Sequence, residues 1–264
     1  MKDWFDLKNK VALITGGNGG VGKGIADALA SAGSDIVIAA RNEIKTAEAV
    51  KDIKSKFGVK VLGVHLDVTQ EDSVISGVRE AVKEFGHINI LVNNAGVNRR
   101  KEAEGVSVDD WDYVLNTNLR GAFLCAKAVY PVMKAAGRGK IINIGSMTSL
   151  LGIVKALPYA CSKMGLLSLT YCLGLEWAKN YIQVNAIIHS WIESPMSGKA
   201  EKDFPGLIQW VKQRTPAGRW GKPSDVGKVA VFLASEASDF VTASYVRADG
   251  GFIQGGITPI PFSA

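Results

Sequence analysis

The chain has 264 residues, of which 47% are apolar and 21% are charged. This balance excludes disordered, collagen-like and disulfide-scaffold proteins, and the length suits one large α/β domain without covalent staples. The net charge of +6 is mild and no run of Lys or Arg exceeds three residues, so the charge leaves a nucleic-acid partner open without arguing for one, and we expect none.

Cysteine content and the N-terminus favour a cytoplasmic protein. The three cysteines lack CxxC spacing, and the first ten residues carry charges where a secretory signal would be apolar. No segment reaches the roughly 18 consecutive apolar residues of a membrane span. We therefore expect no membrane association and no metal site.

Short apolar segments alternate with longer segments of helical periodicity. In chain order we expect a strand at Lys10–Thr15, a helix at Gly20–Ala32, a strand at Asp35–Ala40, a helix at Asn42–Phe57, a strand at Lys60–Leu66, a helix at Glu71–Phe85, a strand at Ile88–Val92, a helix at Trp111–Ala136, a strand at Lys140–Ile144, a helix at Tyr159–Ala178, a strand at Ile182–Ile188, helices at Gly206–Gln213 and Pro223–Ser235, and a strand at Tyr245–Ala248. Since the strands show no polar alternation, helices should cover both faces of a parallel sheet. The sequence thus predicts one α/β domain, residues 1–264, with a doubly wound sheet.

Residues 189–222 interrupt this alternation. They contain Pro195, Pro205, Pro216 and several glycines. A long irregular segment after a strand is typical of a substrate loop or lid.

A glycine-rich turn, TGGNGGVG at Thr15–Gly22, joins the first strand to the first helix. Glycine permits positive φ and a close approach of the backbone to phosphate, and a helix N-terminus attracts a pyrophosphate. A merely flexible turn is the alternative, because glycine spacing alone is a weak signal. The residues expected to bind a dinucleotide here are Gly16, Asn18, Gly20, Val21 and Gly22.

The end of the second strand bears on cofactor choice. In dinucleotide folds an acidic residue there binds the ribose 2′-hydroxyl, whereas a basic residue accommodates a 2′-phosphate. Here Ala40 is followed by Arg41 and Asn42, with no carboxylate. We therefore expect NADP(H), with NAD(H) as the alternative; Arg41 as an ordinary surface residue is the other interpretation.

Two further strand ends supply candidate cofactor contacts. Asp67 and Val68 follow the third strand, and Asp67 either meets the adenine amino group or caps the next helix. The fourth strand ends in NNAG, where Asn94, Ala95 and Gly96 suit packing against a cofactor at the sheet crevice.

Tyr159 and Lys163 are four residues apart and share one helix face, and Ser146 follows the strand that ends at Ile144. A tyrosine with a pKa of about 10 is a poor base at neutral pH. One positive charge at about 4 Å supplies roughly the 4 kcal/mol that would lower this pKa by about three units. Lys163 is the candidate source of that charge.

The motifs TGGNGGVG, NNAG, NTNL with Asn118, Ser146 and YACSK occur in the order and spacing of the short-chain dehydrogenase/reductase family. The chain resembles this family from about Leu7 to Ile253. The resemblance implies a seven-stranded Rossmann fold, a nicotinamide cofactor, a small-molecule carbonyl or alcohol substrate, and a homotetramer or, less often, a dimer. An uncharged segment, Gly250–Ala264, is better covered than exposed, which agrees with assembly.

The resemblance also implies roles for individual residues. Tyr159 would be the general acid/base, and Ser146 would hold and polarise the reacting oxygen. Lys163 would bind the nicotinamide ribose and lower the pKa of Tyr159, and Asn118 would hold a water that links Lys163 to solvent. Ile192 and Ser194 are the expected contacts at the nicotinamide end.

One segment departs from the family pattern. His189 and Ser190 stand where the family usually has Pro-Gly. A less rigid loop with altered nicotinamide contacts is one interpretation, and His189 as an additional base is another.

The substrate is suggested by three basic residues, Arg99–Lys101, just past NNAG. Arg100 matches a basic position in the gluconate 5-dehydrogenase and keto-deoxy-sugar-acid dehydrogenase branch, which the chain resembles; a solvated loop is the alternative. We expect Arg100, Ser146 and Tyr159 to bind a keto-sugar acid or polyol, with 3-oxoacyl thioesters and small cyclic ketones as alternatives. Two other classes stay open: a non-catalytic nucleotide-sensing protein on the same fold, and a nucleic-acid-binding protein.

Overall fold

The structure is a computed structural model that describes residues 3–194 and 204–255. Its strands are β1 (Val11–Thr15), β2 (Asp35–Ala40), β3 (Val61–His65), β4 (Ile90–Asn93), β5 (Gly139–Ile144), β6 (Ile182–His189) and β7 (Ser244–Ala248). Its helices are α1 (Gly20–Ser31), α2 (Glu43–Phe57), α3 (Glu71–Phe85), α4 (Val108–Leu115), α5 (Gly121–Ala135), α6 (Leu157–Trp177), α8 (Leu207–Arg214) and α9 (Pro223–Ala234). The predicted strands and helices are confirmed, with ends that differ by a few residues, except for the helix predicted at Trp111–Ala136. Within the described ranges, no helix is both long enough and apolar enough to cross a bilayer.

The seven strands form one parallel sheet in the order β3-β2-β1-β4-β5-β6-β7. This is the predicted doubly wound Rossmann topology. The strand order reverses at β1, which pairs with β2 on one side and with β4 on the other. The connections that leave β1 and β4 diverge, so a crevice opens at the carboxyl ends of these strands.

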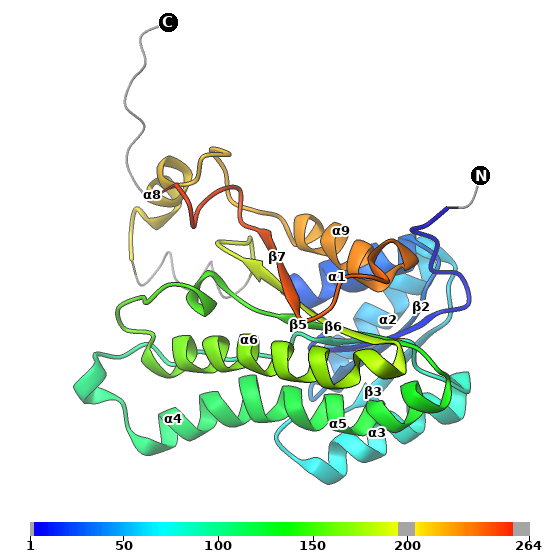
Figure 1. Ribbon diagram of the computed structural model, residues 1–264. Coiled ribbons are helices and arrows are strands. Elements are labelled where there is room, and N and C mark those ends of the chain that lie inside the picture. Colours follow the sequence, from blue (N-terminus) through cyan, green and yellow to red (C-terminus); the bar gives the residue numbers. More distant parts are fainter. Residues whose placement is uncertain (1–2, 195–203, 256–264) are drawn as a thin grey trace, which may run out of the picture.

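Both faces of the sheet are buried, and alternate residues of each strand serve the two faces. In β1, Ala12 and Ile14 belong to the core beneath α1, α2 and α9, whereas Val11 and Leu13 belong to the core beneath α3, α5 and α6. Figure 1 shows these two helical layers, with α4 beside α5 and α6. Burial on both faces is the reason that the strands lack polar alternation.

The structure corrects one predicted helix, Trp111–Ala136. The helix begins earlier, at Val108, because Ser107 caps it by accepting a hydrogen bond from the Asp110 amide. It is then interrupted by a π-helical turn at Asn116–Arg120 before α5 begins. Such turns frequently occur at functional sites, and this one carries Asn118.

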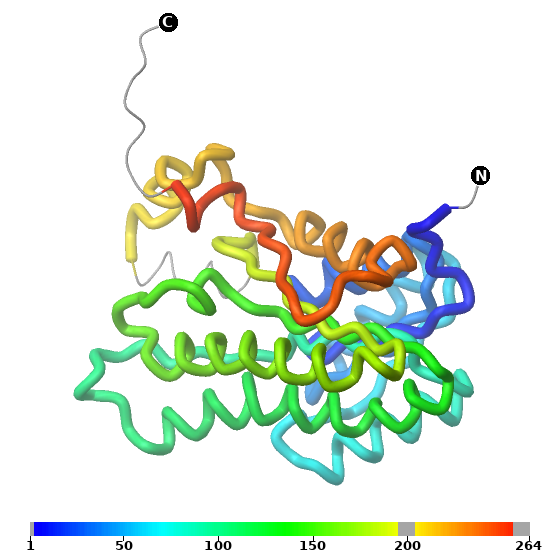
Figure 2. Tube along the Cα trace, in the orientation of Figure 1, coloured from blue at the N-terminus to red at the C-terminus, as the bar shows by residue number. Residues whose placement is uncertain are grey.

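Helices α1 and α9 are in backbone contact, although they lie near opposite ends of the chain (Figure 2). A Cβ atom on Gly24 would lie 2.3 Å from Cβ of Pro223, and one on Gly227 would lie 2.6 Å from the carbonyl oxygen of Gly24. Only glycine fits at these two positions. The contact fixes α1, and with it the glycine-rich turn, against the sheet.

The segment after β6 is anchored to the body by main-chain pairing. The amide of Gly221 donates to the carbonyl of Trp191, and the amide of Glu193 donates to the carbonyl of Gly221.

The predicted short helix is confirmed as α8. Phe252 of the uncharged segment is buried, and its ring lies 6.0 Å from the Trp210 ring of that helix. Pro195 and residues 256–264 of the uncharged segment lie outside the described ranges.

Candidate active site

Two adjoining hollows occupy the crevice at the carboxyl ends of the strands. The larger, of ≈ 470 Å³, is lined by Ser146, Tyr159 and Lys163, and the smaller, of ≈ 290 Å³, is lined by Arg41 and Asp67. The residues shared by both are Gly16, Asn18, Ala95 and Gly96. All the predicted cofactor residues line one hollow or the other: Gly16, Asn18, Gly20, Val21, Gly22, Arg41, Asn42, Asp67, Val68, Asn94, Ala95, Gly96, Tyr159, Lys163, Ile192 and Ser194.

The glycine-rich turn forms a tight backbone cradle. Gly16 and Gly20 have φ of +65° and +53°, values that other residues rarely adopt. A Cβ atom on Gly22 would lie 2.4 Å from Nδ2 of Asn94, so only glycine fits beside that amide. No described side chain caps the N-terminus of α1, whose first amides are therefore available to a pyrophosphate.

Thr15 and Asn94 tie this cradle to the loop after β4. Nδ2 of Asn94 donates to the carbonyl oxygens of Thr15 and Gly16, at 3.0 and 3.1 Å. The Thr15 hydroxyl accepts from the amides of Asn94 and Ala95, at 3.0 and 3.1 Å. Thr15 was not among the expected site residues, although its place just before the first glycine of the turn is a local signal.

The smaller hollow carries two cations at the end of β2. The Arg41 guanidinium is exposed and lies 3.8 Å from the Asp67 carboxylate, and Lys45 also lines this hollow. Lys45 was missed because its placement depends on how α2 begins. Asn42 caps that helix by accepting from the Lys45 amide at 2.9 Å.

Asp67 closes a turn before α3, whose N-cap residue is Gln70. Its Oδ1 accepts from the amide and the hydroxyl of Thr69, at 2.9 and 2.8 Å. Burial acts to raise the pKa of Asp67, but the Thr69 hydrogen bonds and the Arg41 charge outweigh it, and the pKa lies below its usual value. The expectation that Asp67 caps the helix is therefore wrong, whereas a contact with adenine stays a prediction.

Ser146, Tyr159 and Lys163 meet in the larger hollow. The Ser146 side chain is near enough to Tyr159 to act on the pKa of its phenol, and Nζ of Lys163 lies 5.7 Å from the centre of the Tyr159 ring. Lys163 is buried, and its Nζ donates to the carbonyl of Ile144 at 2.7 Å. Burial lowers the pKa of Lys163 to about 8.

The pKa of Tyr159 is shifted upward, opposite to the expected downward shift. Burial raises it, and the Ser146 hydrogen bond and the charge of Arg100 offset that effect only in part. The predicted lowering by Lys163 is not found, because burial outweighs the nearby charges. Tyr159 is therefore held as the protonated phenol at neutral pH.

Asn118 connects the loop after β4 to α6. Its Oδ1 accepts from the Val97 amide at 2.8 Å, and its Nδ2 donates to the Val97 carbonyl and to the Ser162 hydroxyl, both at 3.0 Å. Both amide hydrogens of the side chain are thus occupied. The structure gives Asn118 a positioning role, and the water that it would hold stays a prediction.

His189 lines the larger hollow at the end of β6. Its Nδ1 donates to the Ser190 carbonyl at 2.8 Å, and burial, aided by the charge of Lys163, lowers its pKa to about 4. A histidine with this pKa is neutral at pH 7 and too weak a base to compete with other acceptors. The arrangement argues against His189 as an additional general base.

Of the three basic residues after NNAG, only Arg100 lines the hollow. Arg99 lies over the Tyr113 ring at 4.5 Å, and Lys101 pairs with Asp110 at 2.5 Å. Arg100 lies over the Phe204 ring at 5.6 Å. The solvated-loop interpretation thus fits Arg99 and Lys101, and Arg100 stands apart from them.

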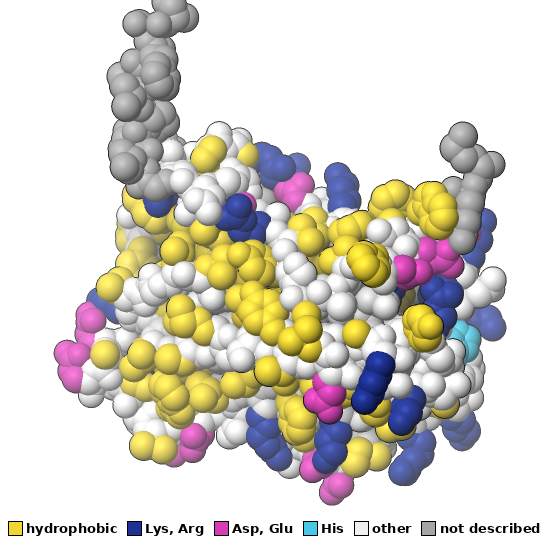
Figure 3. Space-filling view, viewed as in Figure 1, with side chains coloured by type: hydrophobic (Ala, Val, Ile, Leu, Met, Phe, Trp, Pro, Cys, Tyr) yellow, Lys and Arg dark blue, Asp and Glu magenta, His cyan; other side chains and the backbone are white. Residues whose placement is uncertain are grey.

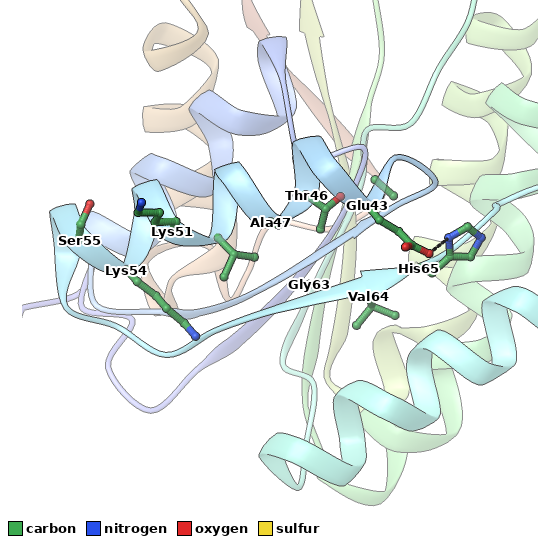
Figure 4. Close-up of a pocket in the computed structure, with 11 residues that line it drawn as sticks. Glu43, Thr46, Ala47, Lys51, Lys54, Ser55, Gly63, Val64 and His65 are labelled. Atoms are coloured by element: carbon green, nitrogen blue, oxygen red, sulfur yellow. Dashed lines mark ion pairs between the residues drawn. The ribbon is translucent and has the colours of Figure 1, made fainter.

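Another hollow, of ≈ 740 Å³, lies between α2 and β3 (Figure 4). The ion pair of His65 with Glu43, at 3.4 Å, stands at one end of it, and Lys51 and Lys54 follow along α2. None of the predicted catalytic or cofactor residues lines it. The candidate site is therefore the crevice at the carboxyl ends of the strands.

The sequence matches the family described as enoyl-(acyl carrier protein) reductase over residues 16–253. It is 40% identical to 2-dehydro-3-deoxy-D-gluconate 5-dehydrogenase of Escherichia coli over 94% of this chain and 97% of that one. It is 37% identical to gluconate 5-dehydrogenase of Gluconobacter oxydans over 94% and 96% of the two chains. A crystal structure of a gluconate 5-dehydrogenase from Burkholderia cenocepacia, in complex with NADP and tartrate, superposes with a TM-score of 0.90 at 38% identity, covering 96% and 98% of the two chains.

Proposed function

This chain belongs to the short-chain dehydrogenase/reductase family and is an oxidoreductase of CH–OH groups, and from that premise we propose that it interconverts a secondary alcohol and a ketone of a sugar acid or polyol with NADP(H). The observation that carries the proposal is that Ser146, Tyr159 and Lys163 line one hollow together with the glycine-rich turn.

The reduction uses each of these side chains at a stated atom. The bound cofactor supplies the hydride and accepts it in the reverse direction. The Ser146 hydroxyl donates to the substrate carbonyl oxygen and polarises it, and the Tyr159 hydroxyl delivers the proton to that oxygen. Because burial raises the pKa of Tyr159, the proton to be donated is present at neutral pH. Lys163 binds the nicotinamide ribose.

NADP(H) is the proposed cofactor, with NAD(H) as the alternative. Arg41 and Lys45 place two cations in the hollow at the end of β2, where the 2′-phosphate would lie. The similar Burkholderia structure is described with NADP.

A sugar acid is the proposed substrate because Arg100 lines the hollow and its charge acts on the pKa of Tyr159. Arginine grips a carboxylate through two parallel hydrogen bonds. The relatives named above are called gluconate and deoxygluconate dehydrogenases, and the Burkholderia structure holds tartrate, a hydroxy acid. 3-Oxoacyl thioesters and small cyclic ketones are the alternatives within the same chemistry, and a non-catalytic nucleotide sensor is the alternative of another class.

We also propose a cytoplasmic homotetramer. Apolar side chains are exposed on α5 and α6 and on β7, among them Phe123, Leu175 and Tyr245. Figure 3 shows such side chains gathered over α5 and α6. Apolar surface of this kind is better covered than exposed, which supports assembly. Light scattering at micromolar concentration tests this proposal, and a monomeric mass would contradict it.

Tyr159→Phe tests the reaction. This substitution removes the proton and keeps the ring, so turnover of a keto-sugar acid with NADPH should fall by at least about 10²-fold, while NADPH affinity stays unchanged. Near-normal turnover of the variant would reject Tyr159 as the acid. A wild-type protein that binds NADPH but oxidises it with none of a panel of keto acids, acyl thioesters and cyclic ketones would favour the sensor.

A further inference from the structure

Three polar side-chain atoms in residues that line the catalytic hollow are buried and have no hydrogen-bond partner within the described part of the chain. They are Oδ1 of Asn98, Oγ1 of Thr148 and Nε1 of Trp191. They come from three separate segments: the loop after β4, the 3₁₀ turn at Met147–Ser149 and the segment after β6. An unpaired polar atom away from water destabilises a fold, so its presence calls for a function.

Packing holds at least two of these groups in place. The Trp191 ring lies against the Trp220 ring, with centroids 5.5 Å apart. The main-chain carbonyl of Trp191 accepts a hydrogen bond from the Gly221 amide at 2.9 Å. Thr148 is 2% exposed, and its amide donates to the Ser146 hydroxyl at 3.3 Å. The Thr148 hydroxyl therefore belongs to a residue in direct contact with the group that polarises the reacting oxygen.

The hydrogen-bonding character of the three atoms is complementary to hydroxyl groups. The Trp191 indole only donates, Oδ1 of Asn98 only accepts, and the Thr148 hydroxyl does both. A hydroxyl group on a substrate also does both. The apolar chain of a 3-oxoacyl thioester and the ring of a small cyclic ketone offer no hydrogen-bond donor beside the carbonyl.

We propose that Thr148, Trp191 and Asn98 are specificity-determining residues that bind hydroxyl groups on the carbon chain beside the reacting carbonyl, so that the enzyme selects polyhydroxylated acids over plain keto acids. The proposal rests on the proposed function and adds the side chains that distinguish a hydroxylated acid from an acid without hydroxyl groups. A site built to bond a hydroxyl rejects the analogue that lacks it, because its own polar atoms are then left unpaired.

The test compares two acids with the same carbon skeleton, 5-keto-D-gluconate and 5-oxohexanoate, which lacks the hydroxyls. Wild type should favour 5-keto-D-gluconate in kcat/KM with NADPH. Thr148→Val and Trp191→Phe should each lower kcat/KM for this substrate by about tenfold or more and leave that for 5-oxohexanoate within about twofold. Equal losses for both substrates, or a wild type that does not discriminate, would overturn the proposal.

Two matched variants and one stability measurement separate recognition from structure. Thr148→Ser keeps the hydroxyl and should keep the preference, and so should Trp220→Phe, since the Trp220 indole already donates to the Ile208 carbonyl at 3.2 Å. Thr148→Val removes an unpaired group at nearly constant volume and should leave the thermal midpoint of the free protein unchanged or raised, whereas Trp220→Phe should lower it. A lowered midpoint in Thr148→Val would count against the proposal.

Titration calorimetry measures the binding of the acids directly, so it tests hydroxyl recognition without relying on turnover. Gluconate and hexanoate, neither of which has a ketone to be reduced, are titrated into wild type and Thr148→Val in the presence of NADPH. A preference for gluconate that Thr148→Val abolishes would support hydroxyl recognition even if no reduction were observed, in which case only the proposed function would fail. Equal binding of the two acids by wild type would overturn hydroxyl recognition and leave the reduction to be judged by Tyr159→Phe.

Discussion

The side-chain amide of Asn118 donates to the hydroxyl of Ser162 at 3.0 Å and thereby joins the π turn to the helix that carries Tyr159 and Lys163. Ser162 in turn donates to the carbonyl of Tyr159 at 2.7 Å. The position of Tyr159 thus depends on a hydrogen-bond chain that begins outside its own helix.

Asn118→Ala should lower both stability and turnover. The substitution leaves the amide and the carbonyl of Val97 without their partner, so the free energy of unfolding should fall by about 1–3 kcal/mol. Loss of the link to Ser162 should also reduce kcat. Urea unfolding and kcat/KM check the prediction, with Asn116→Ala, an exposed asparagine two residues earlier, as the control. Equal behaviour of the two variants would contradict it.

Arg41→Ala should narrow the preference for NADPH over NADH. A charge-assisted hydrogen bond to the 2′-phosphate is worth about 1.5–3 kcal/mol, so NADPH affinity should fall by roughly 10–150-fold while NADH affinity changes little. Fluorescence titration of both cofactors measures this. Arg79→Ala, at an exposed arginine on α3, should change neither. If wild type bound the two cofactors equally well, the role given to Arg41 would be wrong.

Arg100→Ala should remove discrimination between an acid and its neutral analogue. Wild type should favour the keto-sugar acid over the matching neutral keto-sugar by about 1.5–3 kcal/mol in kcat/KM, and the variant should treat them alike. Arg99→Ala is the control, because Arg99 lies over Tyr113 and does not line the hollow. An unchanged preference for the acid in Arg100→Ala would mean that another residue binds the substrate carboxylate.

His189 should make the fold sensitive to mild acid. Its pKa in the folded chain is about 4, against an ordinary value of 6.5. Below pH 6.5 the unfolded chain binds a proton at His189 that the folded chain does not bind. The contribution of the neutral His189 side chain to the free energy of unfolding is therefore complete above pH 6.5 and is lost as the pH falls toward 4. Urea unfolding at pH 7 and pH 5 should show a smaller loss for His189→Gln than for wild type. Equal losses would mean that His189 titrates normally.

The sheet was predictable from the sequence because its strands are buried on both faces and stand out as apolar segments. The division of Trp111–Ala136 was not predictable, because a π turn leaves the apolar periodicity of the flanking helices intact. The cap that starts this helix early does have a local signal, Ser107 with an acid three residues later.

The candidate catalytic and cofactor residues could be identified in the sequence because each belongs to a short motif at a strand end or on one helix turn, and their roles stay predictions. The direction of the Tyr159 pKa shift was not, because it depends on how deeply the phenol is enclosed. Thr148 and Trp191 were missed for a related reason. Nothing local distinguishes a threonine or tryptophan whose polar atom is left unpaired, since this condition arises only when distant segments close around the hollow.

The contact of Gly24 with Pro223 and Gly227 bears on how the protein is made. Helix α9 leaves the ribosome long after α1, yet α1 rests directly on it. A nascent chain can pair β1 with β2 early, but contacts between distant parts of the chain form slowly, and α1 keeps an uncovered side until α9 has been made. The dinucleotide crevice should therefore mature late, and the nascent chain should be open to chaperones until α9 docks.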